Sequence, residues 1–211
     1  FTKEEHDIIG RAGEGVMRLY VVDNESDSSL LRRKALPVSQ EVVRSARFNI
    51  LKERMLATVN DTINPGVGIA APQVGISRSL IAVQRFDKEG EPFEFYINPE
   101  IVYYSEQKAD GNEGCLSVPG LSGIVPRSVE IVVRYTDETS FIEKMERVSG
   151  LTAVIFQHET DHLNGVMFTD RAQSVARDQV NDERLRDIGL MFISVRFGGM
   201  TRLFITDSRP L

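Results

Sequence analysis

The sequence predicts a single α+β domain in which antiparallel β-sheets pack around a central helix, with a second helix nearer the N-terminus. Strand-like segments precede and follow a central helical segment, residues 149–164, without the strand–helix alternation of a parallel sheet. The connections between these segments are short and polar, which suits antiparallel pairing. A length of 211 residues favours one domain, residues 1–211, over two.

This domain is expected to consist of three parts. Residues 1–15 are predicted to form a loosely held N-terminal extension, residues 16–171 the core, and residues 172–211 a C-terminal extension. Within the first part of the core, residues 16–22 are rich in valine, which favours a strand. Apolar side chains at helical spacing predict a helix over residues 40–60.

The middle of the chain is expected to be mostly β-structure. Residues 66–75 are too rich in glycine and too interrupted by proline for a regular element. Five segments that follow have the composition of strands, and the first two flank a turn and predict a hairpin. These segments are residues 79–86, 93–98, 100–104, 128–135 and 140–148. Residues 174–187 favour a short polar helix, and residues 190–197 and 200–206 predict a hairpin around Gly198-Gly199.

Composition and charge exclude several classes of protein. Acidic residues (31) outnumber basic ones (25), and the net charge of −6 argues against a grip on nucleic-acid phosphates. No apolar run approaches the roughly 18 residues that span a bilayer, and residues 1–15 lack the apolar stretch of a signal peptide. The single cysteine, Cys115, excludes an internal disulfide and suits a reducing compartment. We therefore expect a cytoplasmic protein, or one in an organelle, with neither nucleic acid nor membrane as a partner.

The central helix is expected to begin after Ser149 as its N-cap and to end at Gly165. The sequence contains three histidines, and two of them, His158 and His162, stand four residues apart on this helix. Such positions lie about 40° apart around a helix and one turn along it, so both imidazoles can reach one cation. An arbitrary pair at this spacing is more often packed or solvated. Here, however, Glu159 follows the first histidine and the helix is apolar, which together predict a metal-binding helix.

A carboxylate beside the two histidines is expected to act as general base. Glu159 is the natural candidate, because sites with the pattern H-E-x-x-H use their glutamate to activate water. Helix geometry alone does not choose it, since Glu159 and Asp161 lie about 80° on either side of the line that bisects the histidines. The glutamate reaches one methylene further, so we assign Asp161 to a contact that orients a ligand.

The identity of a third protein ligand is open on the residues alone. A metzincin would place a third histidine at the position of Phe168, and His6 lies close to the chain terminus. A thermolysin-like protein would use a downstream acid, for which Glu183 is available. The other candidate is Cys115, which lies in a Gly-rich segment where a packed thiol is uncommon. By local environment these two residues are equally suited.

Three segments together resemble the signature motifs of the peptide deformylase family, in the same order along the chain. They are Gly66-Val67-Gly68-Ile69-Ala70-Ala71-Pro72-Gln73, Glu113-Gly114-Cys115-Leu116-Ser117 and Gln157-His158-Glu159-Thr160-Asp161-His162. The resemblance covers about residues 16 to 171. It departs at both ends, where the N-terminal extension is long and the C-terminal stretch predicts a hairpin in place of the long helix of many members.

The resemblance implies the roles of the site residues and the reaction. It makes Cys115, His158 and His162 the metal ligands, Glu159 the acid/base, and the side-chain amide of Gln73 and the backbone N–H of Leu116 the donors to an oxyanion. The implied core is a metallohydrolase that removes formate from the N-formylmethionine of newly made polypeptides. The implied metal is Fe(II), while the donor set also suits Zn(II), Ni(II) or Co(II). A thiolate ligand leaves less positive charge than three histidines would, so we expect more reliance on Glu159.

The remaining candidates surround these residues. A methionine side chain needs an apolar pocket, and small residues let a peptide backbone approach. The predicted substrate-binding residues are Val67, Gly68, Gly114, Leu151, Val154 and Ile155. Arg127 is expected to pair with Glu113 or Asp161 and brace the site.

The predicted protein is a monomer that acts on nascent chains near the ribosome. Two rivals remain: an endopeptidase with Glu183 as third ligand, and a binding module with an idle site. Metal retention in Cys115→Ala would favour the endopeptidase, and saturable peptide binding without turnover would favour the binding module.

Overall fold

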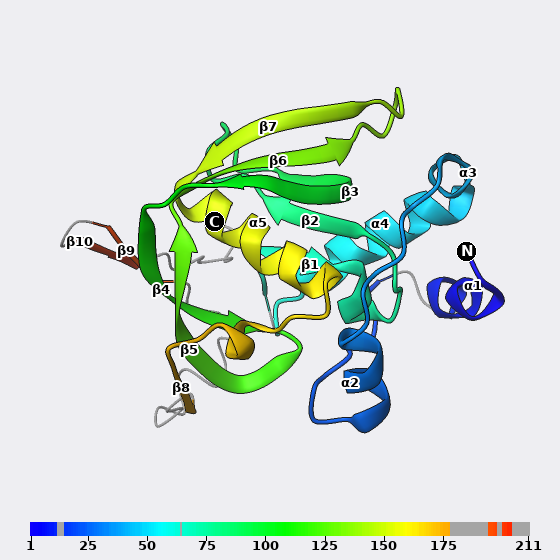
Figure 1. The fold of residues 1–211 in the computed structure, drawn as a ribbon. Coiled ribbons are helices and arrows are strands. Elements are labelled where there is room, and N and C mark those ends of the chain that lie inside the picture. Colours follow the sequence, from blue (N-terminus) through cyan, green and yellow to red (C-terminus); the bar gives the residue numbers. More distant parts are fainter. Residues whose placement is uncertain (12–14, 64, 178–193, 198–199, 204–211) are drawn as a thin grey trace, which may run out of the picture.

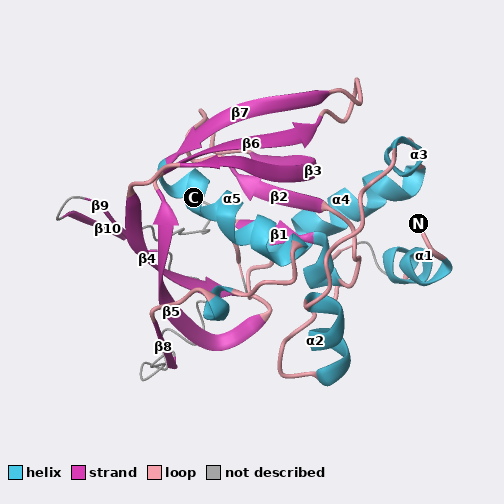
Figure 2. Cartoon of the chain, in the orientation of Figure 1, coloured by secondary structure: helices cyan, strands magenta, loops and turns pink. Residues whose placement is uncertain are grey.

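The computed structural model describes residues 1–211 except residues 12–14, 64, 178–193, 198–199 and 204–211. Helix α5 (Gly150–Leu163) runs between two antiparallel sheets, and the helices of the N-terminal part of the chain lie to one side of it (Figures 1 and 2). The α+β class with antiparallel sheets around a central helix is therefore confirmed. No helix in the described ranges has both the length and the apolar character needed to cross a bilayer.

The first sheet has the strand order β1-β2-β3-β6-β7 and covers one side of α5. Its strands are β1 (Gly68–Ala70), β2 (Leu80–Gln84), β3 (Phe93–Tyr104), β6 (Glu130–Thr136) and β7 (Glu143–Ser149). The predicted hairpin is confirmed as β2 and β3. The segments 93–98 and 100–104 form one strand, β3, with a register shift after Ile97. Asn98 has φ +50° there, and its side-chain amide bonds the backbone N–H and C=O of Val38, which holds the irregularity in place.

The second sheet has the order β10-β9-β4-β5-β8 and lies on the other side of α5. Its strands are β4 (Lys108–Cys115), β5 (Val118–Ser128), β8 (Ser174–Arg177), β9 (Ser194–Phe197) and β10 (Met200–Leu203). The predicted C-terminal hairpin is confirmed as β9 and β10, with its glycine turn outside the described residues. The predicted helix over 174–187 is wrong at its start, because β8 pairs with β5 there, and the rest of it lies outside the described residues.

The central helix α5 has the bounds that the sequence predicts. Ser149 is its N-cap, although its side chain makes no capping hydrogen bond, and Asn164 is the C-cap. Gly165 follows with φ +71°, and a Cβ there would come within 2.3 Å of the carbonyl oxygen of Arg32, so the position requires glycine. Phe156, on the buried face of the helix, packs edge-on against Tyr96 of β3, at 4.6 Å between ring centroids.

The N-terminal part differs most from expectation. Residues 1–15 were expected to be loose, but Lys3–Gly10 form the helix α1, with a capping box between Thr2 and Glu5. The side chain of Ile9 is buried in the core, and Arg78 holds the carboxylate of Glu5 by two hydrogen bonds. An eight-residue helix is marginal alone, so these tertiary contacts stabilise it.

Two further predictions near the N-terminus are corrected. Residues 16–22 form no strand, because their backbone bonds turns and side chains instead of a neighbouring strand. A helix that was not predicted, α2 (Glu25–Leu31), follows them. The predicted helix over 40–60 is two helices, α3 (Gln40–Val43) and α4 (Ala46–Val59), because the side chain of Ser45 caps a new start.

Two short 3₁₀ helices flank the site. They are η1 (Ala71–Val74), directly after β1, and η2 (Phe168–Asp170), after α5.

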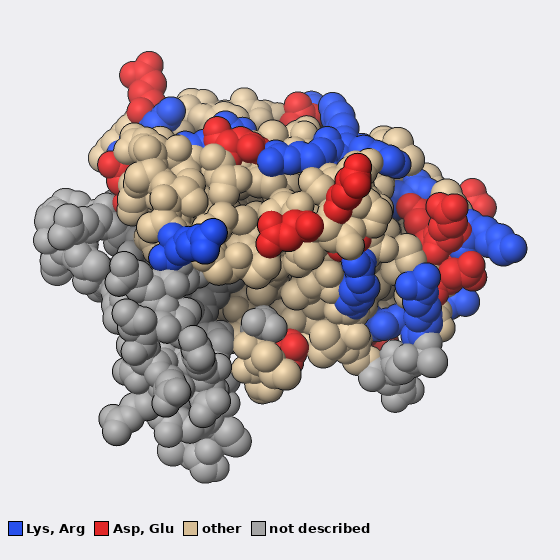
Figure 3. Space-filling view, turned by 90° about the horizontal axis from the view of Figure 1, so that it is seen from below, with Lys and Arg blue, Asp and Glu red and all other residues tan. Residues whose placement is uncertain are grey.

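The charged side chains of the surface are mixed in sign. On the face shown in Figure 3, positive and negative side chains lie close to one another around a broad uncharged area. This pattern agrees with the many ion pairs between elements, such as Lys52 with Glu138 and Arg134 with Glu100.

Candidate metal centre and active site

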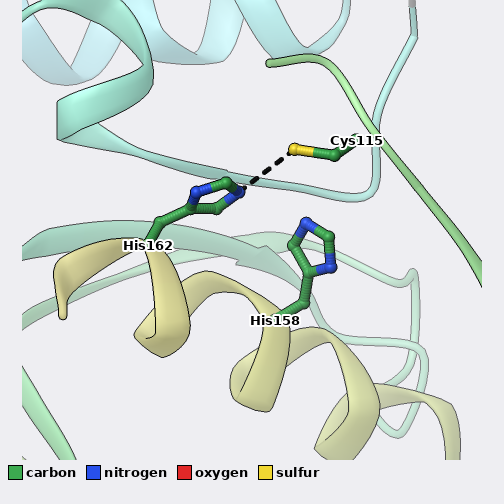
Figure 4. A group of neighbouring side chains, drawn as sticks. All are labelled: Cys115, His158 and His162. Carbon is green, nitrogen blue, oxygen red and sulfur yellow. Dashed lines mark hydrogen bonds between the residues drawn. The ribbon is translucent and has the colours of Figure 1, made fainter. Parts of the chain in front are cut away.

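Three side chains that can bind a metal meet at one point between α5 and β4. The ligand atoms of Cys115, His158 and His162 all lie within 4.8 Å of one another, and Sγ of Cys115 is 3.2 Å from Nε2 of His162. Figure 4 shows both imidazoles projecting from α5 toward the thiol on the opposite strand. The i, i+4 spacing places the two rings on the same face of the helix, one turn apart, with their centroids 5.0 Å from each other.

The structure corrects the setting of the cysteine. Cys115 was expected in a Gly-rich loop, but it is the last residue of β4 and pairs with Val118 of β5. The register shifts between Gly114 and Cys115, which turns the strand locally at the end of the hairpin. The thiol is thus delivered by a hydrogen-bonded hairpin, 47 residues of chain before His162.

A chain of buried charges fixes the orientation of His158. Its Nδ1 is 2.8 Å from Oε2 of Glu113, so Nδ1 carries the proton and Nε2 faces the thiol and the other ring. Arg127 donates two hydrogen bonds to Glu113, at 2.7 and 2.9 Å, and a third to Asp161 at 2.6 Å. Burial raises the pKa of Glu113, but the hydrogen bonds from Arg127 and His158 outweigh it and lower this pKa to about 2. Glu113 therefore stays an anion beside His158.

The chain of charged side chains continues to the surface through Arg171, a residue that was not predicted from the sequence. Arg171, just after η2, donates hydrogen bonds of 2.6 and 2.7 Å to the two carboxylate oxygens of Asp161. Asp161 thus binds two arginines, Arg127 and Arg171, while its backbone belongs to α5. No local sequence signal marks Arg171, since only folding brings it back onto the helix.

The second histidine has a different environment. His162 is buried, and its Nδ1 has no hydrogen-bond partner among the described residues, so only Nε2 meets the thiol. Burial lowers the pKa of His162 well below its ordinary value, and the positive charge of Arg127 acts in the same direction. A neutral imidazole is the form that binds a metal.

Glu159 occupies the wall of the same site. It is buried, and its Oε2 has no hydrogen-bond partner in the described part of the chain. Burial raises its pKa to about 7. Gly68 of β1 makes room for it, because a Cβ at this position would come within 2.6 Å of Oε1 of Glu159 and 2.8 Å of Ile155. The arrangement gives a free carboxylate oxygen and a pKa near neutrality.

Gln73 in η1 points its amide at the thiol. Its Oε1 accepts a hydrogen bond from the backbone N–H of Ala70 at 2.8 Å, which assigns Nε2 to the side facing the site. Nε2 lies 3.6 Å from Sγ of Cys115 and donates to Oγ of Ser117 at 3.3 Å. Ser117 lies in the second of the three motifs, yet the sequence predicted no role for it. The turn residues Leu116 and Ser117 join β4 to β5 beside the thiol.

A small pocket opens beside these groups. Its lining combines apolar side chains with two acids and a histidine: Val67, Glu113, Gly114, Val154, Ile155, His158 and Glu159. Of the predicted substrate-binding residues, Gly68 lies behind Glu159, and Leu151 packs against the core cluster around Tyr96 and Phe156 instead of lining the pocket. The α5 residues that line the pocket lie in the middle of the helix and include His158, so the pocket and the Cys-His-His group share this side chain.

The residues present fit a divalent metal. Two imidazoles and one thiolate are ligand types that Zn(II), Fe(II), Ni(II) and Co(II) accept, and three protein ligands leave a position for a reacting molecule. Glu159, with its unpartnered oxygen, lies in the same pocket as His158. The alternative ligand Glu183 lies outside the described residues.

Comparison with known proteins gives one consistent result. The sequence model of the polypeptide deformylase family matches residues 19–178. The peptide deformylase of Roseiflexus castenholzii is 33% identical over 176 residues, covering 77% of this chain and 91% of that protein. That of Natranaerobius thermophilus is 40% identical, covering 73% and 93%. The Met-Ala-Ser-bound crystal structure of the class I type b peptide deformylase from Acinetobacter baumannii has a TM-score of 0.66 and 34% identity, covering 75% and 99%.

Proposed function

The chain belongs to the polypeptide deformylase family and is a deformylase, and from this premise we propose that it removes the formyl group from N-formylmethionyl peptides with a metal held by Cys115, His158 and His162. The single observation that carries the proposal is the convergence of these three side chains beside a buried glutamate. The products would be formate and a peptide with a free N-terminus.

The three ligands would hold the ion from two sides. A bound divalent metal supplies Lewis acidity, which polarises a carbonyl and lowers the pKa of a water molecule. His158 is oriented by Glu113, and His162 and Cys115 close the set from α5 and β4. Arg127 keeps the Glu113 carboxylate ionised, and the hydrogen bond that this carboxylate accepts from His158 would strengthen the imidazole as a ligand.

Glu159 would move the protons. Its carboxylate takes a proton from the attacking water as the oxygen approaches the formyl carbon, and passes it to the departing amine nitrogen. The Oε2 atom of Glu159 has no hydrogen-bond partner and can bind the proton, and a pKa of about 7 lets the carboxylate accept and release that proton near neutral pH. Positioned acid–base catalysis of this kind typically contributes about 10²- to 10⁴-fold in rate.

Two donors would stabilise the oxyanion that forms on the formyl oxygen. The amide of Gln73 is held with Nε2 toward the thiol, and an amide donates without titrating. The backbone N–H of Leu116 is the second proposed donor, in the turn directly after Cys115. Removing one such donor typically costs about 10²- to 10³-fold in kcat.

The pocket suggests how the substrate is held. Val67, Val154 and Ile155 offer apolar contact for a methionine side chain, while Gly114 leaves space beside the strand for a peptide backbone. The Acinetobacter baumannii relative carries the peptide Met-Ala-Ser in its crystal structure, which supports a peptide that begins with methionine. Action on nascent chains near the ribosome, by a cytoplasmic monomer, stays a prediction from the sequence.

The decisive test is formate release from a formyl-Met peptide by metal-loaded protein, compared with Glu159→Gln. We expect turnover in the wild type and a loss of about 10²-fold or more in the variant, with the bound metal retained. Glu159→Gln keeps the size of the side chain, so unfolding of the protein does not confuse the result. Absence of formate release above this variant would refute the proposal.

The endopeptidase rival is separated by metal content. If Cys115 is a ligand, Cys115→Ala loses its metal while Glu183→Ala keeps it, as measured by elemental analysis after dialysis. The reverse result would support the rival.

The identity of the metal has its own test. Elemental analysis of protein prepared without oxygen tests the proposal that Fe(II) is the working ion, with Zn(II) as the alternative.

A further inference from the structure

An extended segment near the N-terminus joins η1 to the β4–β5 turn, the two places that carry the proposed oxyanion donors. We call residues 18–22 the strap. The backbone N–H of Tyr20 donates to the carbonyl of Gln73 at 2.8 Å, and that of Val22 donates to the carbonyl of Ser117 at 2.9 Å. The strap therefore spans from η1 to the β4–β5 turn, just before the chain enters α2 (Figure 1).

A side-chain contact adds to the hydrogen bond between the strap and η1. The ring of Tyr20 lies directly over Gly75, the residue that ends η1 with φ +84°. A Cβ at this glycine would come within 2.5 Å of the ring, so the fit leaves no space between them. The turn that follows Gln73 is thus held by a backbone bond and a packed ring.

The strap is itself locked by a buried acid that the proposed chemistry does not use. Asp27 of α2 is only 2% exposed, and its Oδ2 accepts hydrogen bonds from Nη2 of Arg18 at 2.7 Å and from the backbone N–H of Val21 at 3.2 Å. The guanidinium of Arg18 also lies over the Tyr20 ring, 4.5 Å from its centroid. Asp27 thus fixes both flanks of Tyr20.

We propose that Asp27 is a positioning residue for deformylation: by locking the strap, it holds the amide of Gln73 and the backbone of Leu116 at a fixed separation. The inference rests on the function proposed above. Donors to an oxyanion act only if they are in place before charge develops, and a misplacement of about 1 Å can cost up to about 100-fold. No metal ligand contacts Asp27 through the bonds described, so metal binding should be unaffected.

The first test compares Asp27→Ala and Asp27→Asn with Asp23→Ala, an exposed acid in the same stretch of chain. We expect kcat on a formyl-Met peptide to fall about tenfold in Asp27→Ala, with KM and metal content unchanged. Asp27→Asn should recover part of the loss, because its amide oxygen still accepts from Val21. Asp23→Ala should match the wild type. An unchanged kcat in Asp27→Ala would overturn the inference.

A double-mutant cycle identifies the route of the effect. If Asp27 acts through the donor at Gln73, Asp27→Ala should lower kcat much less in a Gln73→Ala background than in the wild type. The inference requires that Asp27 acts on the separation of the two donors, so an equal loss in both backgrounds would overturn it, because removal of one donor would then leave the effect of Asp27 unchanged. Amide hydrogen exchange gives a readout apart from activity: the N–H groups of Tyr20 and Val22 should exchange faster in Asp27→Ala, and unchanged exchange also counts against the inference.

A second variant, Arg18→Ala, tests the inference if Asp27→Ala does not fold. Arg18→Ala removes one partner of Asp27 at a half-exposed side chain and leaves the buried acid bonded to Val21. We expect a loss of kcat of a few-fold with unchanged KM, and a wild-type kcat would overturn the inference. A wild-type protein that releases no formate would instead refute the proposed function, so the two failures are distinguishable.

Discussion

Two buried arginines lie on the two sides of α5, and they serve different purposes. Arg127 binds Glu113 and Asp161, both of which are themselves buried, and Glu113 in turn contacts His158, a proposed metal ligand. Arg85 is 1% exposed and binds three carboxylates that are each about one-third open to solvent, on Asp87, Glu94 and Glu146.

The difference lies in what each network leaves behind when it is broken. Without Arg127, the anion of Glu113 would be stranded in the interior, where an unpaired charge is costly. Without Arg85, its carboxylates could be hydrated where they stand. Arg85 packs over Phe156 and bonds the hydroxyl of Tyr96, so it braces the sheet against α5, whereas Arg127 braces a ligand. The same residue type therefore holds a proposed metal ligand in place at one position and braces the sheet at the other, and both positions contribute to stability.

The largest effect is expected from Arg127→Met, which keeps a long unbranched side chain but removes the charge. The free energy of unfolding should fall by about 3–5 kcal/mol, because Glu113 and Asp161 lose their buried partner. Metal affinity should fall about 10- to 100-fold, since the Glu113 carboxylate that orients His158 loses the arginine that holds it in place. Urea unfolding and metal titration with a chelator measure the two effects. Retention of wild-type metal affinity would break the contrast between the two arginines.

Arg85→Met is the matched variant on the other side of the helix. We expect a smaller loss of stability, about 2 kcal/mol, because the freed carboxylates reach water. Metal affinity and kcat should equal those of the wild type, since none of the partners of Arg85 touches the site. A loss of metal in this variant, measured in the same titration, would show that the two networks are coupled through α5.

The smallest expected effect is on the free energy of unfolding at acid pH. The hydrogen bond from Arg85 lowers the pKa of Asp87, and contacts with Lys88, Tyr96 and Arg85 outweigh burial and lower that of Glu94. A lowered pKa in the folded state contributes stability above the unfolded pKa, about 4 to 4.5, which is lost as the pH falls through the folded value. Unfolding at pH 6 and pH 3.5 should therefore show less acid destabilisation in Asp87→Asn and Glu94→Gln, by less than about 1 kcal/mol each. An unchanged pH dependence would mean that Arg85 leaves these acids unaffected.

Much of the site could be predicted because its signals are local. The pair His158 and His162 follows from helical spacing alone, and α5 has the predicted ends at Ser149 and Gly165. The choice between Cys115 and Glu183 could not be made locally, and the family resemblance supplied it. Strands β4 and β5 escaped prediction because glycine and proline favour turns in isolation, yet here the ladder between the two strands satisfies their backbone.

The parts that were missed are those whose stability comes from elsewhere in the chain. Helix α1 needs Arg78, which bonds Glu5, and Arg54, whose guanidinium bonds the carbonyls of Ile8 and Ile9 at the end of the helix. The strap looks like a strand by composition, but its hydrogen bonds go to turns and to Asp27. No pattern within either segment identifies these partners.

The sequence by itself determined the fold class, the helix that presents two imidazoles and a glutamate, and the residue types available for a metal. These features depend on spacing along the chain, which helix and strand geometry converts directly into direction. Only the tertiary structure decided that β4 delivers the thiol to that helix, that burial raises the pKa of Glu159 to about 7, and that Arg171 binds Asp161. Those features depend on packing and desolvation among residues far apart in the chain, which no local pattern encodes.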